Sequence, residues 1–183
     1  NRSLNLTRIT SPDEFWIKHV ADSLSIGMAV PSVLQGALTV ADIGFGGGFP
    51  LAPLAWANAD LVITGFESRQ KKVQFVAQEL DTLGLNNANV VAQQAREAAR
   101  TSKYHAAFDM VVARAVKEGA YMLKHCRGLL KSEPGAALVL YKTPEAVAEE
   151  RRATEREAVR HGMHVSVSDI IALPRGFGNR QSV

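Results

Sequence analysis

A glycine-rich loop holds the residues of this sequence best suited to contact a ligand. Residues 40–50 read Val-Ala-Asp-Ile-Gly-Phe-Gly-Gly-Gly-Phe-Pro, so an apolar segment leads into consecutive glycines. Glycine permits a tight turn and removes the side chains that would keep a ligand away from the backbone. Pro50 and Pro53 mark the first turn of a helix, where unpaired N–H groups and a partial positive charge favour anions. The segment therefore predicts a strand–loop–helix junction that binds an anionic ligand group.

The spacing of the glycines separates several kinds of nucleotide loop. Gly44 and Gly46 match the first two positions of the dinucleotide fingerprint G-x-G-x-x-G, but the third glycine would fall at Phe49. No Gly-Lys-Ser/Thr follows, so the phosphate-loop signature fails as well. What remains, Asp42-x-Gly-x-Gly-x-Gly, resembles motif I of the class I S-adenosyl-L-methionine (SAM) methyltransferases. An ordinary strand-to-helix turn is the alternative interpretation.

A carboxylate at the end of the next apolar segment points to a nucleoside. Glu67 lies 23 residues after Gly44. This is close to the spacing of roughly 20 residues at which an acid accepts hydrogen bonds from a ribose. A carboxylate can accept from both ribose hydroxyls, whereas a solvated loop acid would have no such partner. We interpret Glu67 as a ribose ligand because it accompanies the glycine loop.

Strands and helices alternate along the chain, which predicts parallel βαβ units. The first helix is expected over residues 12–29, with Ser11 as N-cap and Glu14 as the capping-box acid. The expected strands are 38–43, 61–67, 88–92, 108–113, 136–141 and 165–173, and the later helices are 51–57, 69–83, 116–130 and 144–161. The predicted fold is α/β and Rossmann-like, with a mostly parallel twisted sheet flanked by helices on both faces. We expect one domain over 1–183, with the helical segment 1–32 packed on its core.

The carboxyl ends of the parallel strands are expected to line one cleft, because ligands of such sheets bind there. Two cations, Arg114 and Lys142, directly follow apolar strands. Either could simply solvate a strand end, but beside a nucleotide cleft they are placed to meet a phosphate or a purine edge. Arginine can bind the O6 and N7 edge of guanine. The predicted cleft residues are 44–49, 67–68, 94–97, 114–115 and 142–143.

Composition limits the other classes of protein. The chain has 183 residues, 46% of them hydrophobic, which is enough for one sizeable core. No apolar run is long enough to span a membrane, and no signal peptide opens the sequence. A single cysteine, Cys126, excludes an internal disulfide and favours the cytoplasm. His161 and His164 lack further ligands, so no metal site is predicted. The net charge of +3 leans weakly towards a polyanionic partner.

Several motifs together make the chain similar to a known family. They are Asn5-Leu6-Thr7, His19-x-x-Asp22-Ser23-Leu24, the glycine loop, Glu67-Ser68 with Lys71-Lys72, Arg96-Glu97, Ala113-Arg114-Ala115 and Leu140-Tyr141-Lys142. They resemble the RsmG or GidB family of bacterial methyltransferases, which modify a guanine at N7 in 16S ribosomal RNA. The resemblance covers nearly the whole chain. It implies a SAM-dependent rRNA methyltransferase of the cytoplasm, acting on 16S rRNA or the small ribosomal subunit and expected to be a monomer.

The resemblance also implies which residues serve the reaction. Arg114, Lys142, Asp22 and His19 are expected at the catalytic centre. The expected cofactor ligands are Asp42, Gly44, Gly46, Phe49, Glu67, Ser68, Arg96, Glu97 and Arg114. Arg2, Arg8, Lys18, Arg175 and Arg180 are the basic residues expected to contact RNA phosphates. The target base must leave its stack, and Phe49 and Tyr141 are candidate rings for it to stack on, although both could equally belong to the core.

The chain departs from the family at two points. The loop more often reads Gly-Thr-Gly-Pro-Gly-Leu-Pro, so Phe45 replaces a small hydroxyl residue, and one hydrogen bond to the cofactor is expected to be lost. The family's additional N-terminal helical residues and its last strand, after the region of Arg180, are expected to be missing.

The sequence lacks an obvious Ser/His/Asp or Cys/His set, and N7 methylation needs none. Guanine N7 carries a free lone pair at neutral pH, so an in-line transfer requires positioning rather than a general base. Asp22 is a candidate to stabilise the positive charge that develops on the purine, with His19 one turn away on the same helix face. Equally, both residues could only fasten this helix to the sheet.

Two other functions use the same motifs. A methyltransferase acting on a small molecule or another RNA would share the glycine loop and Glu67. A non-catalytic RNA- or nucleotide-binding module would keep the fold but bind RNA without SAM. The fold alone does not separate these functions. Loss of affinity with rising salt is expected only where phosphates are bound.

Overall fold

The computed structural model of the chain describes residues 6–7, 9, 11–174 and 179–183. Within these residues, one sheet has the strand order β3-β2-β1-β4-β5-β7-β6. The strands are β1 (Thr39–Ile43), β2 (Val62–Glu67), β3 (Ala88–Ala92), β4 (Met110–Arg114), β5 (Ala137–Lys142), β6 (Ile171–Ala172) and β7 (Asn179–Ser182). Strands β1 to β5 pair in parallel, and β7 is antiparallel to both β5 and β6. The predicted, mostly parallel α/β sheet is confirmed.

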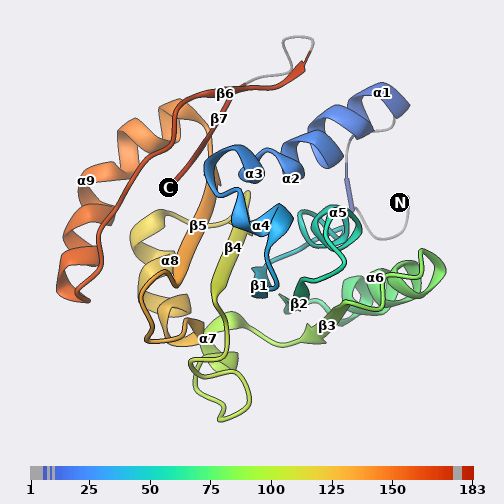
Figure 1. Cartoon of the computed structure of the whole chain (residues 1–183), viewed down its shortest axis with the longest axis horizontal. Helices are drawn as coiled ribbons and strands as arrows, with labels where there is room; N and C mark the ends of the chain where they lie inside the picture. Colours follow the sequence, from blue (N-terminus) through green and yellow to red (C-terminus); the bar gives the residue numbers. More distant parts are fainter. Residues whose placement is uncertain (1–5, 8, 10, 175–178) are drawn as a thin grey trace.

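Helices cover both faces of this sheet (Figure 1). The N-terminal ones are α1 (Pro12–Phe15), the π-helix η1 (Trp16–Ala21), α2 (Asp22–Leu24), α3 (Ile26–Ala29) and α4 (Ser32–Gln35). The others are α5 (Leu51–Ala57), α6 (Gln70–Thr82), α7 (Ala95–Ala98), α8 (Gly119–Cys126), the 3-10 turn η2 (Arg127–Leu129) and α9 (Pro144–Arg160). Figure 1 shows α9 at one end of the molecule and α1 and α6 towards the other.

The core has two halves because successive residues of a strand point to opposite faces. On β1, Val40 joins an apolar cluster with α3, α4, α5 and α6, whereas Ala41 joins a second cluster with α7 and α8. Ile26 and Val33 are fully buried in the first cluster. The N-terminal helices therefore contribute to the packing of the sheet.

The helix predicted over residues 12–29 is not one regular helix. Its middle is the π-helix η1, and Ser11 makes no side-chain cap bond, although its carbonyl accepts from the Phe15 N–H at 2.9 Å. The capping box predicted with Glu14 is therefore wrong. The Glu14 carboxylate instead accepts from Lys18 Nζ at 2.7 Å, one turn further on. A π-turn has no simple signature in hydrophobic spacing, which explains why the pattern did not predict it.

The C-terminal part also differs from expectation. The strand predicted over residues 165–173 is reduced to β6, because Ser168 interrupts the ladder. The Ser168 Oγ accepts the Ser182 N–H at 2.9 Å. A short strand that the sequence analysis did not predict, β7, spans Arg180 and pairs with the end of β5. Arg180 therefore lies within the sheet, on β7.

Candidate functional site

The glycine loop lies between β1 and α5, and three of its glycines have left-handed backbones. The φ angles are +71° at Gly44, +57° at Gly46 and +96° at Gly48. A side chain would be strained in each of these conformations, and at Gly48 it would also contact the Val76 side chain. The loop is tied to the sheet by the Gly44 N–H, which donates to the Phe66 carbonyl at 2.8 Å. It therefore forms a fixed cradle of exposed backbone beside the end of β2.

Phe45 occupies the core rather than the ligand side of the loop. Its ring is 1% exposed and packs over Gly65 of β2. A Cβ added to Gly65 would come within 2.6 Å of Phe45 Cδ1, so the ring takes the space that this glycine leaves. The replacement of a small hydroxyl residue by Phe45 thus has a packing role, which the sequence comparison had not predicted.

Asp42 lies beneath the loop and does not face a ligand. Its side chain is fully buried, and Oδ2 accepts the Leu51 N–H at 2.9 Å, which caps the start of α5. Burial raises the pKa of the Asp42 carboxyl to about 7, against the lowering effects of the Leu51 bond and of Arg114. The expected cofactor contact is therefore corrected to support of the loop. The free N–H groups expected at this helix start are also partly used, since Ala52 donates to Gly48.

Glu67 ends β2 directly beside the glycine loop. Its Oε1 accepts from the Arg69 N–H at 3.1 Å and from the Ser68 hydroxyl at 3.2 Å. These bonds fix the half-buried carboxylate, while Ser68 is exposed. The position is suitable for a pair of ribose hydroxyls. Arg96 and Glu97 lie on α7, after the neighbouring strand β3, and both are exposed. Their expected part in cofactor binding stays a prediction.

Arg114, at the end of β4, is held by three groups of the N-terminal helices. Its Nη1 donates to Asp22 Oδ2 at 2.9 Å and to the Lys18 carbonyl at 3.0 Å. Its Nη2 lies 3.2 Å from His19 Nδ1. The guanidinium carbon also lies 5.6 Å from the centre of the Phe49 ring. The structure therefore brings Arg114, Asp22, His19 and Phe49 together, as the sequence analysis expected.

His19 is held on both ring nitrogens. Arg114 has only donors, so Nδ1 must accept, and Nε2 then donates to Thr7 Oγ1 at 2.7 Å. Burial, then the charge of Arg114, lowers the pKa of His19, against the raising effect of Asp22. The ring stacks on Phe49 with centroids 4.5 Å apart and an interplanar angle of 13°. The described contacts link His19 and Asp22 through Arg114 rather than to each other.

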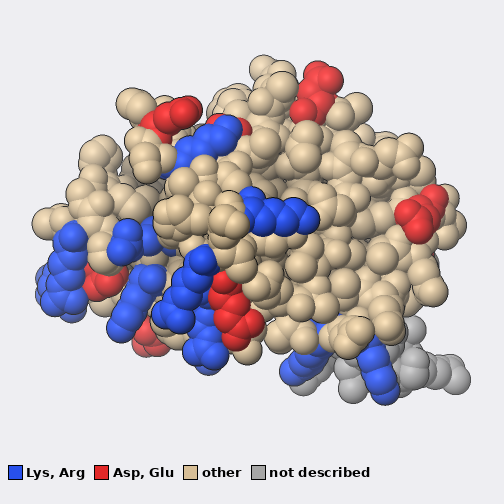
Figure 2. Space-filling view, turned by 90° about the horizontal axis from the view of Figure 1, so that it is seen from below, with Lys and Arg blue, Asp and Glu red and all other residues tan. Residues whose placement is uncertain are grey.

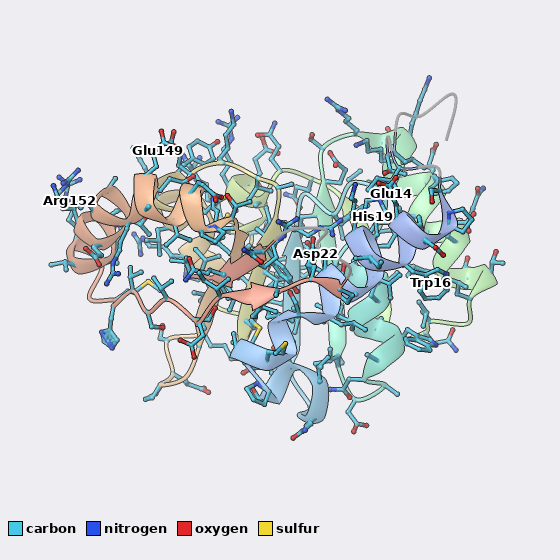
Figure 3. The ribbon with its side chains drawn as sticks, turned by 90° about the horizontal axis from the view of Figure 1, so that it is seen from above. Glu14, Trp16, His19, Asp22, Glu149 and Arg152 are labelled. Carbon is cyan, nitrogen blue, oxygen red and sulfur yellow. The ribbon has the colours of Figure 1, made fainter. Side chains whose placement is uncertain are left out.

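Asp22 has a second arginine, which the sequence analysis had assigned to RNA. Arg180 Nε, on β7, lies 2.7 Å from Asp22 Oδ1, and the Asp22 side chain is only 2% exposed. Arg180 thus neutralises a buried carboxylate, and its expected contact with RNA phosphate is corrected. Figure 3 shows His19 and Asp22 near the middle of the molecule, whereas Trp16 points outward and Arg152 lies at the far end, on α9. The pairing could not be predicted because 158 residues separate its members.

Lys142 is turned away from the Arg114 cluster. Its Nζ lies 2.9 Å from Glu150 Oε2 on α9 and donates to the Lys117 carbonyl at 3.0 Å. Tyr141 is also unsuited to stack a base, because its ring is 4% exposed and its hydroxyl donates to the Ser23 carbonyl at 2.6 Å. Both side chains hold the sheet to its helices, which for Tyr141 is the core role that the sequence had left open, whereas a catalytic role for Lys142 stays a prediction. Phe49 is half-buried.

The remaining expectations concern charge and ions. Arg2, Arg8 and Arg175 lie outside the described residues. Among the residues that are described, no group of three His, Cys, Asp or Glu side chains is placed to hold a metal ion. In the same part of the chain, no helix is both long and apolar enough to cross a membrane.

The comparisons with known proteins give the family. The family model described as rRNA small subunit methyltransferase G matches residues 1–175. The chain belongs to the GidB family. A relative named "Ribosomal RNA small subunit methyltransferase G" in Limosilactobacillus fermentum is 37% identical over 95% of this chain and 70% of its own length. One of the same name in Nostoc sp. is 36% identical over 95% of this chain and 71% of its own length.

Solved structures agree on the fold. A SAM dependent methyltransferase from Aquifex aeolicus has a TM-score of 0.66 at 15% identity, covering 97% of this chain and 94% of that one. Fibrillarin from Aeropyrum pernix, with bound SAM, has a TM-score of 0.64 at 12% identity, covering 88% and 71%. The chain is therefore a SAM-dependent rRNA methyltransferase of the GidB family, with a class I methyltransferase fold.

The residues present fit this cofactor. The loop offers backbone without side chains at Gly44 and Gly46, and the Glu67 carboxylate lies beside it. An adenosyl ligand needs this pair of features: close approach to the backbone and an acceptor for the ribose hydroxyls. Gly44, Gly46 and Glu67 are thus the residues of this chain that would hold SAM.

Proposed function

We propose that this protein methylates N7 of a guanine in 16S rRNA, with Arg114 as the residue that receives the base. The observation that carries the proposal is the fixation of Arg114 by Asp22, His19 and the Lys18 carbonyl, at the strand end beside the glycine loop. A guanidinium has five N–H donors. Three are used by these described contacts, so Nε and one Nη2 hydrogen remain for an acceptor such as guanine O6.

The reaction needs positioning more than proton transfer. SAM supplies an electrophilic methyl group on its sulfonium, and guanine N7 already carries a lone pair. His19 is not available as a base, because one nitrogen accepts from Arg114 and the other donates to Thr7. Correct orientation of two reactants is worth up to about 7–11 kcal/mol of the barrier. We therefore assign Arg114 and Phe49 to holding the base and His19 to holding Arg114.

Asp22 acts as a positioning residue in this proposal. It is almost completely buried and already faces two guanidinium groups, so it supplies little free negative charge to a product purine. The role considered from the sequence, stabilisation of charge on the base, is therefore replaced by orientation of Arg114. Ser68, Arg96 and Glu97 remain proposed cofactor ligands at the ends of β2 and β3.

The RNA partner is expected to be held mainly through its phosphates. The chain carries 21 Lys and Arg against 18 Asp and Glu. Figure 2 shows many Lys and Arg side chains towards one side of the face seen from below, with Asp and Glu side chains among them. RNA binding should weaken steeply with salt, since phosphate contacts release counterions. We also propose that the enzyme works in the cytoplasm as a monomer, which light scattering would test.

The decisive experiment supplies labelled SAM and small ribosomal subunits from cells that lack this activity. Label should appear on N7 of one guanine, located by nuclease digestion and mass spectrometry. Arg114→Ala should lower the rate at least about 100-fold, because the base loses its fixed donor. Arg152→Ala, on the outer face of α9, is the matched control and should retain the wild-type rate. Transfer to another atom, or equal rates in both variants, would contradict the proposal.

A further inference from the structure

Lys72 brings a positive charge to the glycine loop. The residue lies in the first turn of α6. Its Nζ lies 4.0 Å from the position that a Cβ on Gly46 would take. The backbone there has φ +57°, so only glycine is relaxed at this point of the loop. The ammonium group therefore lies beside the space that the missing side chain leaves open.

The start of α6 is unfavourable for a cation unless an anion is also present. The positive end of a helix dipole repels Lys and Arg in the first turn. Here Arg69 is the N-cap and Lys71 and Lys72 follow it, and this turn contains no acidic residue. Within the described parts of the chain, Lys72 has no ion-pair partner. Local rules are broken in this manner mainly at functional sites.

The neighbouring acid forms no ion pair with Lys72 in the described structure. Glu67 is the nearest acid in sequence, and its Oε1 is already bound by the Arg69 N–H and the Ser68 hydroxyl. The Lys72 side chain is half-buried, whereas Lys71 is exposed. A half-buried ammonium group without an ion-pair partner among the described residues thus lies beside the space above Gly46.

We propose that Lys72 binds an anionic oxygen group above Gly46 during methyl transfer. The proposed reaction offers two sources of this chemistry: the carboxylate of the methionyl part of SAM, and a phosphate of the RNA. A charge-assisted hydrogen bond to either group would offset the unfavourable interaction of Lys72 with the helix dipole. The inference rests on the proposed function for the identity of its two ligands. Its test measures ligand binding and needs no methyl transfer.

The test is calorimetry on the full chain with two cofactor relatives. S-adenosylhomocysteine carries the carboxylate, whereas methylthioadenosine has the same nucleoside without it. If the carboxylate is the ligand, Lys72→Met should weaken S-adenosylhomocysteine about tenfold and leave methylthioadenosine unchanged. Lys72→Arg keeps the charge and should restore most of the affinity. Lys71→Met removes the same charge from the same turn and is the matched control, expected to change binding less than twofold.

The RNA source has its own outcome. Lys72→Met would leave S-adenosylhomocysteine binding intact, weaken 16S rRNA binding, and reduce the slope of log K against log salt by about one. Unchanged affinity for both ligands, or equal losses in the Lys72 and Lys71 variants, would overturn the inference. Failure of the wild-type protein to bind either ligand would count against the proposed function instead. Circular dichroism is the control that each variant is folded.

Discussion

Arg114 and Asp22 are joined by a 2.9 Å contact between Nη1 and Oδ2, with side chains 14% and 2% exposed. The two residues are 92 positions apart, one at the end of β4 and the other on α2. Arg180 of β7 adds a contact of 2.7 Å to the other carboxylate oxygen. One buried charge thus connects the N-terminal helices, the centre of the sheet and its antiparallel edge. The same charge orients the guanidinium that we assign to the base.

Removing this carboxylate should therefore affect both stability and rate. In Asp22→Asn, two guanidinium groups lose their counter-charge while the side chain keeps its size. We expect the free energy of unfolding to fall by about 3 kcal/mol, as for other broken buried pairs. The rate of methyl transfer should fall about 10- to 100-fold, because Arg114 is no longer fixed. Urea denaturation and single-turnover labelling measure the two effects.

An exposed ion pair provides the control for this variant. Arg151 and Glu155 form an i,i+4 pair on α9, with side chains 56% and 42% exposed. Glu155→Gln should change the unfolding free energy by less than about 0.5 kcal/mol, since solvent screens such pairs. Equal losses in the two variants would mean that the buried charge has no special role.

Sequence rules correctly predicted the features of the site that depend on the backbone, namely the glycine loop and the strand ends beside it. Glycine chemistry located the loop, and the rule for parallel sheets placed Glu67 and Arg114 at the carboxyl ends of β2 and β4, the strands on either side of β1. Arg180 was assigned to RNA because a contact between side chains 158 residues apart, such as that of Arg180 with Asp22, leaves no local trace in the sequence. Lys142 follows its strand as predicted, but alternation and spacing do not say which way a strand-end side chain turns. Tertiary packing decides both cases.

The buried carboxyl beneath the loop should make stability depend on pH. The pKa of Asp42 is raised from 3.8 to about 7 in the folded protein, mainly by burial. Between these values the folded state binds more protons than the unfolded state, so stability falls as pH rises through this window. Asp42→Asn keeps an acceptor for Leu51 and cannot ionise. Its stability relative to wild type should therefore rise from pH 4 to pH 8, by a few kcal/mol at most. Urea titrations at several pH values measure this, and a constant difference would contradict it.

The contribution of His19 to stability should depend on pH with the opposite sign to that of Asp42. Burial and Arg114 lower the pKa of the ring below 6.5, so the folded state holds fewer protons than the unfolded one just below this value. The stability that His19 contributes is thus present above pH 6.5 and is lost as pH falls through its folded pKa. Protonated Nδ1 also cannot accept from Arg114. NMR of the ring protons should show the low midpoint, and Arg114→Met should move it partly back. A midpoint unaffected by Arg114→Met would remove the charge as a cause.

The contact between Phe45 and Gly65 should make β2 intolerant of even one methyl group. An added Cβ at position 65 meets Phe45 Cδ1 at 2.6 Å and also the side chain of Leu51. Overpacking of this kind costs about 1–3 kcal/mol, which Gly65→Ala should show in thermal or urea unfolding. The double variant Gly65→Ala, Phe45→Leu should recover part of the loss, because a smaller side chain frees space. Strictly additive losses would mean that the two positions do not share this space.

The sequence analysis placed Lys142 at the catalytic centre, whereas its contacts in the structure suggest a role in stability. A variant of Lys142 distinguishes the two roles. Its Nζ binds Glu150 of α9 and the Lys117 carbonyl, with a side chain only 10% exposed. Lys142→Met and Glu150→Gln should each reduce stability, with a coupling energy of about 1–2 kcal/mol in the double-mutant cycle. Methyl transfer by the folded Lys142→Met protein should stay within about twofold of wild type, because orientation of Arg114 is untouched. A large fall in rate for Lys142→Met, with Glu150→Gln unaffected, would return Lys142 to the catalytic centre and show that its side chain swings towards the substrate.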